Sequence, residues 1–178
     1  VHGTDNSRCL IALSLITGHV GRPGTGLHPL RGQNNVQGAS DAGLIPMVYP
    51  NYQSVEDVDI RNFFEDKWGR SLDPTKGLTV VEIMNRIVSR EMFGMYVMGE
   101  NPAMSDPDQN HARLALSKLQ HLVVQDIFFT ETAWFADVIF PASAQPEKAG
   151  TYSNSNRQVQ IGFPVRKTPG EARQDWKL

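Results

Sequence analysis

The feature that most constrains the fold is a series of three short apolar segments, separated by helical segments, in the second half of the chain. The apolar segments are 95–98, 122–124 and 137–140, and the helical segments between them are 107–120 and 130–135. The strand segments are continuously apolar rather than alternating, which is typical of parallel strands covered on both faces. Connections between such strands are right-handed crossovers. The sequence therefore predicts an α/β fold with a parallel, doubly wound, Rossmann-like sheet and helices on both faces.

Helices are also expected earlier in the chain, at 6–17, 59–68 and 80–88. Asp5 or Asn6 can cap the first of these helices. Thr79 and Glu82 have the spacing of a capping box before the third. Asp106 is expected to cap the helix at 107–120.

Polar residues follow the first two strands directly. Gly99, Glu100 and Asn101 follow the first strand, and Gln125 and Asp126 follow the second. The carboxyl ends of parallel strands form one rim, which is where ligands bind in this architecture. Each group also precedes a helix whose first N–H groups can hold an anion. This favours a nucleotide-like ligand, and the alternative is that these are ordinary turn and cap residues. The sequence has no G-x-G-x-x-G or Walker motif, so it lacks the standard dinucleotide fingerprint.

A long segment rich in glycine and proline, 21–38, holds five of the 15 glycines. This density is incompatible with a regular helix or strand. Its amide side chains offer hydrogen-bond donors and acceptors, and Arg31 offers a planar cation that suits a carboxylate or a phosphate. Composition supports a ligand-binding loop and a surface loop with an incidental arginine equally well.

Composition excludes several classes of function. A net charge of −2 leaves no basic footprint for nucleic acid. The longest apolar run, 10–16, is too short to cross a membrane. Cys9 is the single cysteine, so the chain forms no internal disulfide and cannot by itself ligate an iron–sulfur cluster through cysteines. We expect Cys9 to be a small buried apolar residue rather than a nucleophile. No signal peptide is visible, and both ends look cut, so we expect a piece of a larger, cytoplasmic protein.

The last segment, 142–178, has no regular periodicity, and its portion 147–157 is polar and extended. It is expected to pack on another domain or to act as a linker. Lys148 and Arg157 could contact phosphates, although a surface salt bridge is the commoner arrangement for either side chain.

Several motifs together resemble one family. They are RGQNNVQG at 31–38, MGENP at 98–102, VQDIF at 124–128, TETA at 130–133, ADVI at 136–139, HGTDN at 2–6 and EKAGT at 147–151. The chain resembles the molybdopterin oxidoreductases over essentially its whole length, and within them the catalytic (alpha) subunits of formate dehydrogenases. The resemblance implies a bis-(molybdopterin guanine dinucleotide) cofactor with molybdenum or tungsten.

The resemblance also implies roles for individual residues. Arg31 resembles the arginine that holds the carboxylate of formate beside the metal, and Lys148 resembles the lysine that reaches a cofactor phosphate or ring. The implied cofactor-binding residues are His2, Asn6, Gly32, Gln33, Gly99, Glu100, Asn101, Gln125, Asp126 and Lys148.

By this resemblance, the parent enzyme oxidises formate to carbon dioxide. The metal ligand, a cysteine or selenocysteine, and a [4Fe–4S] cluster belong to an N-terminal part that is not in this chain. Electrons leave through iron–sulfur and flavin subunits, with NAD bound by a partner. Since the chain looks like a central fragment, we expect it to be inactive alone.

The resemblance implies three parts along the chain. Residues 1–34 would end a neighbouring α/β domain and carry the Arg31 loop. Residues 35–141 would form the Rossmann-like cofactor-binding domain, and residues 142–178 would pack on another domain of the parent. Two relatives remain as alternatives: a nitrate-type oxidoreductase, and the large iron–sulfur subunit of complex I, which keeps the fold without a metal site. Arg31, together with Asn34 and Asn35, favours formate over both.

Overall fold

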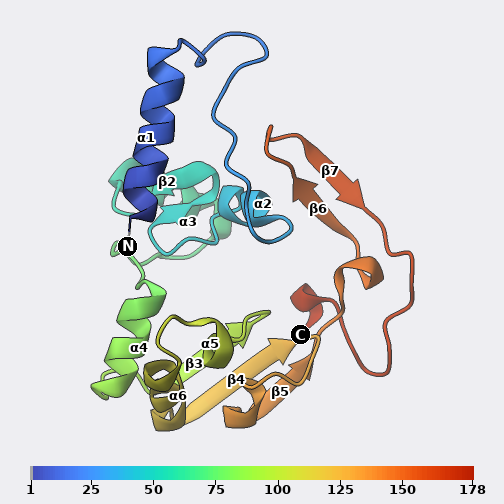
Figure 1. The fold of residues 1–178 in the computed structure, drawn as a ribbon. Helices are drawn as coiled ribbons and strands as arrows, with labels where there is room; N and C mark the ends of the chain where they lie inside the picture. The colour runs from blue at the N-terminus through green and yellow to red at the C-terminus, as the bar shows by residue number, and fades with distance from the viewer. Residues whose placement is uncertain (1) are drawn as a thin grey trace.

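The computed structural model describes residues 2–178 (Figure 1). The helices are α1 (Gly3–Ile16), α2 (Val36–Asp41), α3 (Val58–Trp68), α4 (Val80–Val88), α5 (Pro102–Ser105) and α6 (Gln109–Lys118). The strands are β1 (Val48–Tyr49), β2 (Gln53–Ser54), β3 (Gly94–Met98), β4 (His121–Asp126), β5 (Val138–Pro141), β6 (Gly150–Ser153) and β7 (Val159–Gly162). Four 3-10 helices complete the order: η1 (Pro50–Tyr52), η2 (Ala133–Phe135), η3 (Gln145–Glu147) and η4 (Asp175–Lys177).

The largest sheet has the order β3-β4-β5, and both of its strand pairs are parallel. In register, Val97 lies opposite Val124, and Val124 lies opposite Ile139. The three apolar segments are therefore neighbours in sequence order, as the alternation of strand and helix predicted. This confirms an α/β fold built on a parallel sheet with helices packed on it.

The main core lies on one face of this sheet. Leu122 and Val124 of β4 are fully buried against Ala103 of α5 and Leu116 of α6. Helix α4 extends this layer, because Met84 and Ile87 pack on Ala115 of α6 in an adjoining cluster. Figure 1 shows α4, α5 and α6 gathered beside the sheet.

The opposite face of the sheet is more open. Side chains alternate between faces along a strand, and Met98 pairs in register with Gln125, so Tyr96, Met98 and Gln125 share this face. Tyr96 and Met98 are each 51% exposed. Gln125, in contrast, is buried because Asp175 of η4 lies over it and hydrogen-bonds to it.

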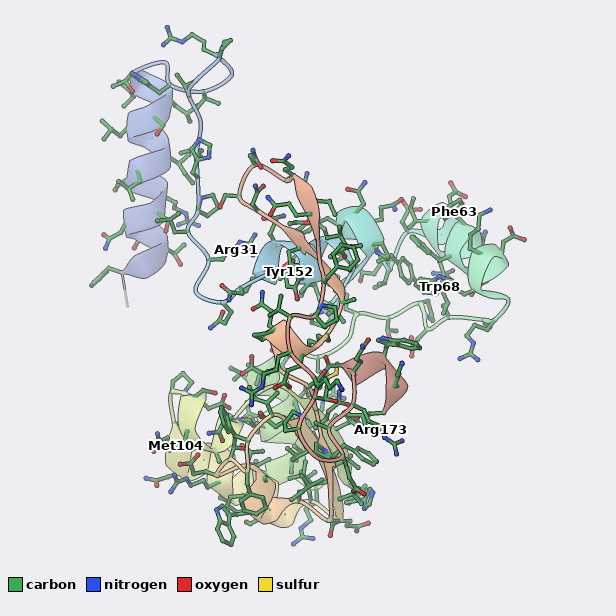
Figure 2. All side chains as sticks on the ribbon, turned by 90° about the vertical axis from the view of Figure 1, so that its right-hand side faces the viewer. Arg31, Phe63, Trp68, Met104, Tyr152 and Arg173 are labelled. Carbon is green, nitrogen blue, oxygen red and sulfur yellow. The ribbon has the colours of Figure 1, made fainter. Side chains whose placement is uncertain are left out.

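A second, smaller core forms around α3. Phe64 packs on Tyr49 of β1 with ring centroids 4.8 Å apart, and Val55 completes the buried cluster. Trp68 packs on Phe64 at 4.9 Å between ring centroids but stays half exposed, as does Phe63, and both lie far from Arg31 in Figure 2. The predicted helix is thus present, although only part of its apolar side is buried.

Helix α1 stands away from the rest of the chain, as the turned view of Figure 2 shows, and none of its residues is buried. It begins at Gly3, earlier than predicted, so Asp5 lies in its first turn instead of capping it. Cys9 is exposed, and the expectation that it is buried was wrong. The reason is that no other element of the described residues packs on this helix. None of the helices among residues 2–178 is long and apolar enough to span a membrane.

Two other boundaries differ from the predictions. Pro102–Ser105 forms a helix of its own, α5, which ends at Asp106 in extended backbone. Asp108, rather than Asp106, therefore caps α6, by accepting the N–H of His111 at 3.0 Å. The glycine-rich segment is irregular up to Asn35, but its end belongs to helix α2.

The capping box before α4 is present as predicted. The Thr79 N–H donates to Glu82 Oε2 at 2.7 Å, and the Glu82 N–H donates to Thr79 Oγ1 at 3.4 Å. The Thr79 hydroxyl also donates to Glu82 Oε2, at 2.7 Å. The hydrogen bonds that the Thr79 N–H and then the Thr79 hydroxyl donate to the Glu82 carboxyl lower its pKa.

Beyond β5 the chain forms the antiparallel hairpin β6–β7, which packs beside α2 (Figure 1). Arg157 of the hairpin loop pairs with Asp41 of α2 at 3.0 Å, which is the surface salt bridge considered as its alternative role. The final segment then returns to the sheet. Arg173 donates its N–H to the carbonyl of Pro141 at 3.0 Å, and η4 is placed at the end of β4.

Candidate functional site

The carboxyl ends of β3 and β4 lie together. The Gly99 N–H donates to the carbonyl of Gln125 at 2.8 Å, which fixes the turn after β3 against β4. Gly99 has a φ of +65°, and a Cβ added there would meet no atom within 4 Å. The backbone at Gly99 is therefore open on the side of a neighbouring cavity, so a ligand could approach it closely.

A cavity of about 230 Å³ lies at this rim. Four of the predicted site residues line it: Gly99, Gln125, Asp126 and Lys148. Lys148 comes from the segment before β6, so two distant parts of the chain meet here. Asp126 also stabilises its own turn, since Oδ1 accepts the N–H groups of Ile127 at 2.6 Å and Phe128 at 3.2 Å.

Asn101 and Glu100 point elsewhere. Asn101 Oδ1 accepts the N–H of Thr132 at 3.1 Å and its hydroxyl at 2.7 Å, while Asn101 Nδ2 donates to Glu131 at 2.8 Å. The hydrogen bond from Asn101 lowers the pKa of the Glu131 carboxyl. Asn101 thus joins the start of α5 to the loop before η2. Glu100 lines a separate, mainly apolar cavity between α4 and β3.

Gln125 is the centre of a polar network at the rim. It is 1% exposed, its Oε1 accepts the hydroxyl of Tyr96, and its Nε2 donates to Asp175 Oδ1 at 2.9 Å. Lys148 donates to Asp175 Oδ2. Burial raises the pKa of the Asp175 carboxyl, but the hydrogen bonds from Lys148 and Gln125 outweigh burial and hold it below its usual value. The network therefore keeps Asp175 ionised.

The segment around Arg31 is fastened to the β6–β7 hairpin by amide side chains. Asn35 Nδ2 donates to the carbonyl of Thr151 at 2.9 Å, and Asn35 Oδ1 accepts the N–H of Ser153 at 3.0 Å. Asn34 Nδ2 donates to Gln145 Oε1 at 3.2 Å. Asn35 has a φ of +64°, a conformation that asparagine tolerates better than most residues. These contacts hold the loop over the hairpin.

Arg31 and Gln33 line a cavity of about 240 Å³ opposite residues 153–155 of the hairpin. Arg31 is exposed, and Nη2 is 3.4 Å from Gln37 Oε1. In Figure 2 Arg31 lies on the loop next to the strands that carry Tyr152. The guanidinium therefore keeps donors available to a ligand.

Three neighbouring cavities share lining residues, and we refer to them together as the groove. The Arg31 cavity shares Asn34 and Asn35 with a second cavity of about 380 Å³. The second cavity shares Gln145, Lys148 and Asp175 with the rim cavity. The groove thus runs from Arg31, past Lys148, to Gly99. Its volume is on the scale of small-molecule sites, about 300–1,000 Å³.

His2 and Asn6 lie outside the groove. Both are on or beside the exposed helix α1, where the Asn6 N–H donates to the carbonyl of His2 at 2.9 Å. Gly32 is in the Arg31 loop but is not among the residues that line the groove.

Sequence reasoning missed three residues of the groove or its network. Asp175 and Tyr96 belong to the Gln125 network, and Ser143 lines the rim cavity. The Ser143 hydroxyl is buried and has no hydrogen-bond partner among the described residues. Asp175 follows a segment without periodicity, so no spacing pattern could have found it.

The groove has the chemistry of an anion and heterocycle site. It offers two cations, Arg31 and Lys148, beside two carboxylates, Asp126 and Asp175, together with several amide groups and open backbone at Gly99. No cluster of three or more metal-ligating side chains occurs in residues 2–178. The charged and amide groups of the groove suit a polar organic ligand, and Arg31 suits a carboxylate or a phosphate.

The sequence matches the molybdopterin oxidoreductase family over residues 1–178. It is 50% identical over 175 residues to the F420-dependent formate dehydrogenase subunit alpha of Methanocaldococcus jannaschii, covering 98% of this chain and 26% of that protein. It is 45% identical over 176 residues to the subunit alpha of F420-dependent formate dehydrogenase 1 of Methanococcus maripaludis, covering 99% of this chain and 26% of that protein. It is 42% identical over 174 residues to putative formate dehydrogenase YrhE of Bacillus subtilis, covering 98% of this chain and 18% of that protein.

Among solved structures, acetylene hydratase from Pelobacter acetylenicus matches with a TM-score of 0.50 and 20% identity. The match covers 55% of this chain and 14% of that one. At this identity the likeness shows a common fold. The chain spans about a quarter or less of the length of these curated relatives.

Proposed function

Because the chain belongs to the molybdopterin oxidoreductase family, we propose that it forms part of a formate dehydrogenase alpha subunit. In this subunit it would hold a molybdopterin cofactor along the groove and present Arg31 to formate. The observation that carries the proposal is the row of three cavities with shared lining residues, which leads from Arg31 past Lys148 to the rim of the parallel sheet. The activity would belong to the complete subunit.

The residues of the groove fit the cofactor. Lys148 would hold a phosphate or a ring oxygen, and the open backbone at Gly99 would let the cofactor approach the sheet. The buried Ser143 hydroxyl, which has no partner among the described residues, marks a place at the rim where a hydrogen-bonding group is expected. The guanine dinucleotide form of the cofactor is proposed from the family resemblance. The cofactor would supply the two-electron redox chemistry, and the protein would position the cofactor and set the electrostatic field around it.

Arg31 would act on the substrate. Formate has one carboxylate and no remote groups, so its orientation depends on very few contacts. A guanidinium can donate two parallel hydrogen bonds to a carboxylate, which fixes both oxygens and the direction of the C–H bond. Loss of this hydrogen as a hydride equivalent, with release of carbon dioxide, would then complete the oxidation.

The remaining parts of the assembly are proposed from the family resemblance. The molybdenum or tungsten ligand and the [4Fe–4S] cluster would come from outside this chain, since Cys9 is its single cysteine and lies on α1, away from the groove. Residues 1–34, 35–141 and 142–178 would belong to three parts of the subunit. NAD on a partner subunit stays our prediction, and two of the relatives are named as F420-dependent.

The cofactor proposal can be tested by replacing Lys148 with methionine in the complete subunit. This removes the charge and keeps most of the stem. Hydrogen bonds to charged groups are worth roughly 1.5–3 kcal/mol, so we expect about 10- to 100-fold weaker retention of the pterin. The pterin is measured by fluorescence after oxidative release.

The matched control is Lys76→Met. Lys76 also pairs with a carboxylate, Glu56, at 2.8 Å, but it lies outside the groove. The control should keep its pterin. Equal pterin content in both variants and the unmodified subunit, with unfolding temperatures alike, would contradict the assignment of Lys148.

A further inference from the structure

The orientation of the Gln125 amide is determined by its two partners. A carboxylate only accepts hydrogen bonds, so the group that faces Asp175 Oδ1 at 2.9 Å must be the NH₂ of the amide. The amide oxygen then faces the Tyr96 hydroxyl, which must donate. Rotating the amide by 180° would place two acceptors against each other at Asp175.

Tyr96 is therefore the group that satisfies the buried end of Gln125. The amide is 1% exposed in the folded chain, and the Tyr96 hydroxyl is the donor that its oxygen accepts, so removing the hydroxyl leaves that oxygen without this partner. An unsatisfied buried acceptor is costly, and it would weaken the preference for the present amide orientation. Tyr96 belongs to β3 and Asp175 belongs to η4, so Gln125 of β4 links the Tyr96 hydroxyl to the Asp175 carboxylate through hydrogen bonds at the two ends of its amide.

Asp175 in turn fixes two elements. Its Oδ1 accepts from Gln125 of β4, and its Oδ2 accepts from Lys148, which precedes β6. The N–H of Leu178 donates to the Asp175 carbonyl at 3.4 Å, and that of Lys177 donates to the Gln174 carbonyl at 2.8 Å. The carboxylate of Asp175 thus helps to hold η4 at the groove, in addition to the backbone hydrogen bonds of Arg173 with Pro141 and Ser143.

We propose that Tyr96 is a positioning residue of the groove, whose hydroxyl holds the Gln125 amide in the orientation that fixes Asp175, η4 and Lys148. Its place in cofactor binding rests on the function proposed above, but its control of η4 does not. Tyr96 itself lines the separate cavity between α4 and β3, so it acts through Gln125 and not by contact with the groove.

The test is hydrogen exchange of the backbone amides of Lys177 and Leu178 in the complete subunit, isolated without cofactor. Tyr96→Phe removes the hydroxyl and keeps the ring. One hydrogen bond is worth about 1 kcal/mol, so we expect roughly 5-fold faster exchange at these amides. Tyr52→Phe is the control, because the Tyr52 hydroxyl makes no hydrogen bond with any residue of 2–178.

The Asp175→Ala background, which removes the acceptor of the Gln125 NH₂, separates positioning from general destabilisation. If Tyr96 acts through Gln125 and Asp175, its substitution should accelerate exchange much less when Asp175 is already replaced. An equal acceleration in both backgrounds would overturn the proposal, as would unchanged exchange in Tyr96→Phe alone. Because no cofactor is present, this outcome is independent of the pterin measurement that tests the proposed function.

Discussion

At the scale of single residues, the site divides into side chains with a structural partner and side chains left available. Asn101 is engaged by Thr132 and Glu131, which agrees with the turn-and-cap alternative. Gln125 and Lys148 both line the rim cavity. The position of Gln125 at the end of its strand had predicted this place for Gln125. Asp175 was not predictable, because its partners lie 50 and 27 positions away in the sequence and no local pattern encodes such contacts.

The ionised state of Asp175 leads to a prediction about acid stability. Its pKa is lowered in the folded chain, so its stabilising contribution is complete above the pKa of the unfolded chain. This contribution is lost as the pH falls through the folded pKa, which lies below 3.8. Denaturant unfolding between about pH 6 and pH 2 measures this loss.

The comparison variant is Asp175→Asn. We expect the unmodified protein to lose more stability than the variant as the pH falls through this window. Asp73, Glu82 and Glu131 also have lowered pKa values, but they are unchanged in both proteins. Parallel pH profiles for the two proteins would contradict the prediction, because they would show that the hydrogen bonds from Lys148 and Gln125 do not stabilise the ionised form of Asp175 in the folded chain.

At the scale of elements, the sequence predicts an element well when its determinants are local. The capping box at Thr79 and the apolar strands are local signals, and the structure confirms them. Asp106 was the wrong cap for α6 because Pro102 starts a separate short helix, which moves the next helix start to Asp108. The exposed state of α1 had no local signal, because it depends on which other elements reach that helix.

The cap of α4 gives a stability prediction for an element. Thr79→Ala removes the hydroxyl that accepts the Glu82 N–H and that also donates to the Glu82 carboxylate. Losing such an N-cap typically costs about 1 kcal/mol, within a range of roughly 0.5–2. Chemical denaturation measures the change. Ser71→Ala, at an exposed position outside any helix, is the control and should change stability by less than about 0.5 kcal/mol. Equal effects of the two substitutions would show that the box does not stabilise α4.

At the scale of the whole molecule, the chain buries its core around one parallel sheet and leaves other apolar surfaces exposed. Ile16 of α1 is 84% exposed and Leu30 is 91% exposed, while Tyr96 and Met98 lie on the open face of the sheet. Large exposed apolar surfaces are typical of interfaces. They support the proposal that this chain works within a longer polypeptide, as relatives about four times its length do.

The groove is the feature that connects this architecture to function. The two ends of the groove were predictable, because Arg31 lies in a glycine-rich segment and Gly99 directly follows an apolar strand. The connection between them was not predictable, since it depends on amide contacts from the loop to η3 and to the β6–β7 hairpin, more than 110 positions later in the sequence. Only the folded chain brings the proposed substrate cation and the proposed cofactor site into one space.

The most direct test of this account is the kinetics of Arg31→Lys in the complete subunit, with pterin content measured in parallel. Arg22→Lys is the matched control, because Arg22 lies in the same loop but bonds to the carbonyl of Gly18, outside the groove. Replacing a bidentate guanidinium with a point charge removes directed hydrogen bonds worth roughly 1.5–3 kcal/mol. We predict that kcat/KM for formate falls about 10- to 100-fold in Arg31→Lys, with normal pterin content, and stays unchanged in Arg22→Lys. Unchanged kcat and KM in Arg31→Lys, or a loss of pterin in step with activity, would contradict the assignment of Arg31 to formate.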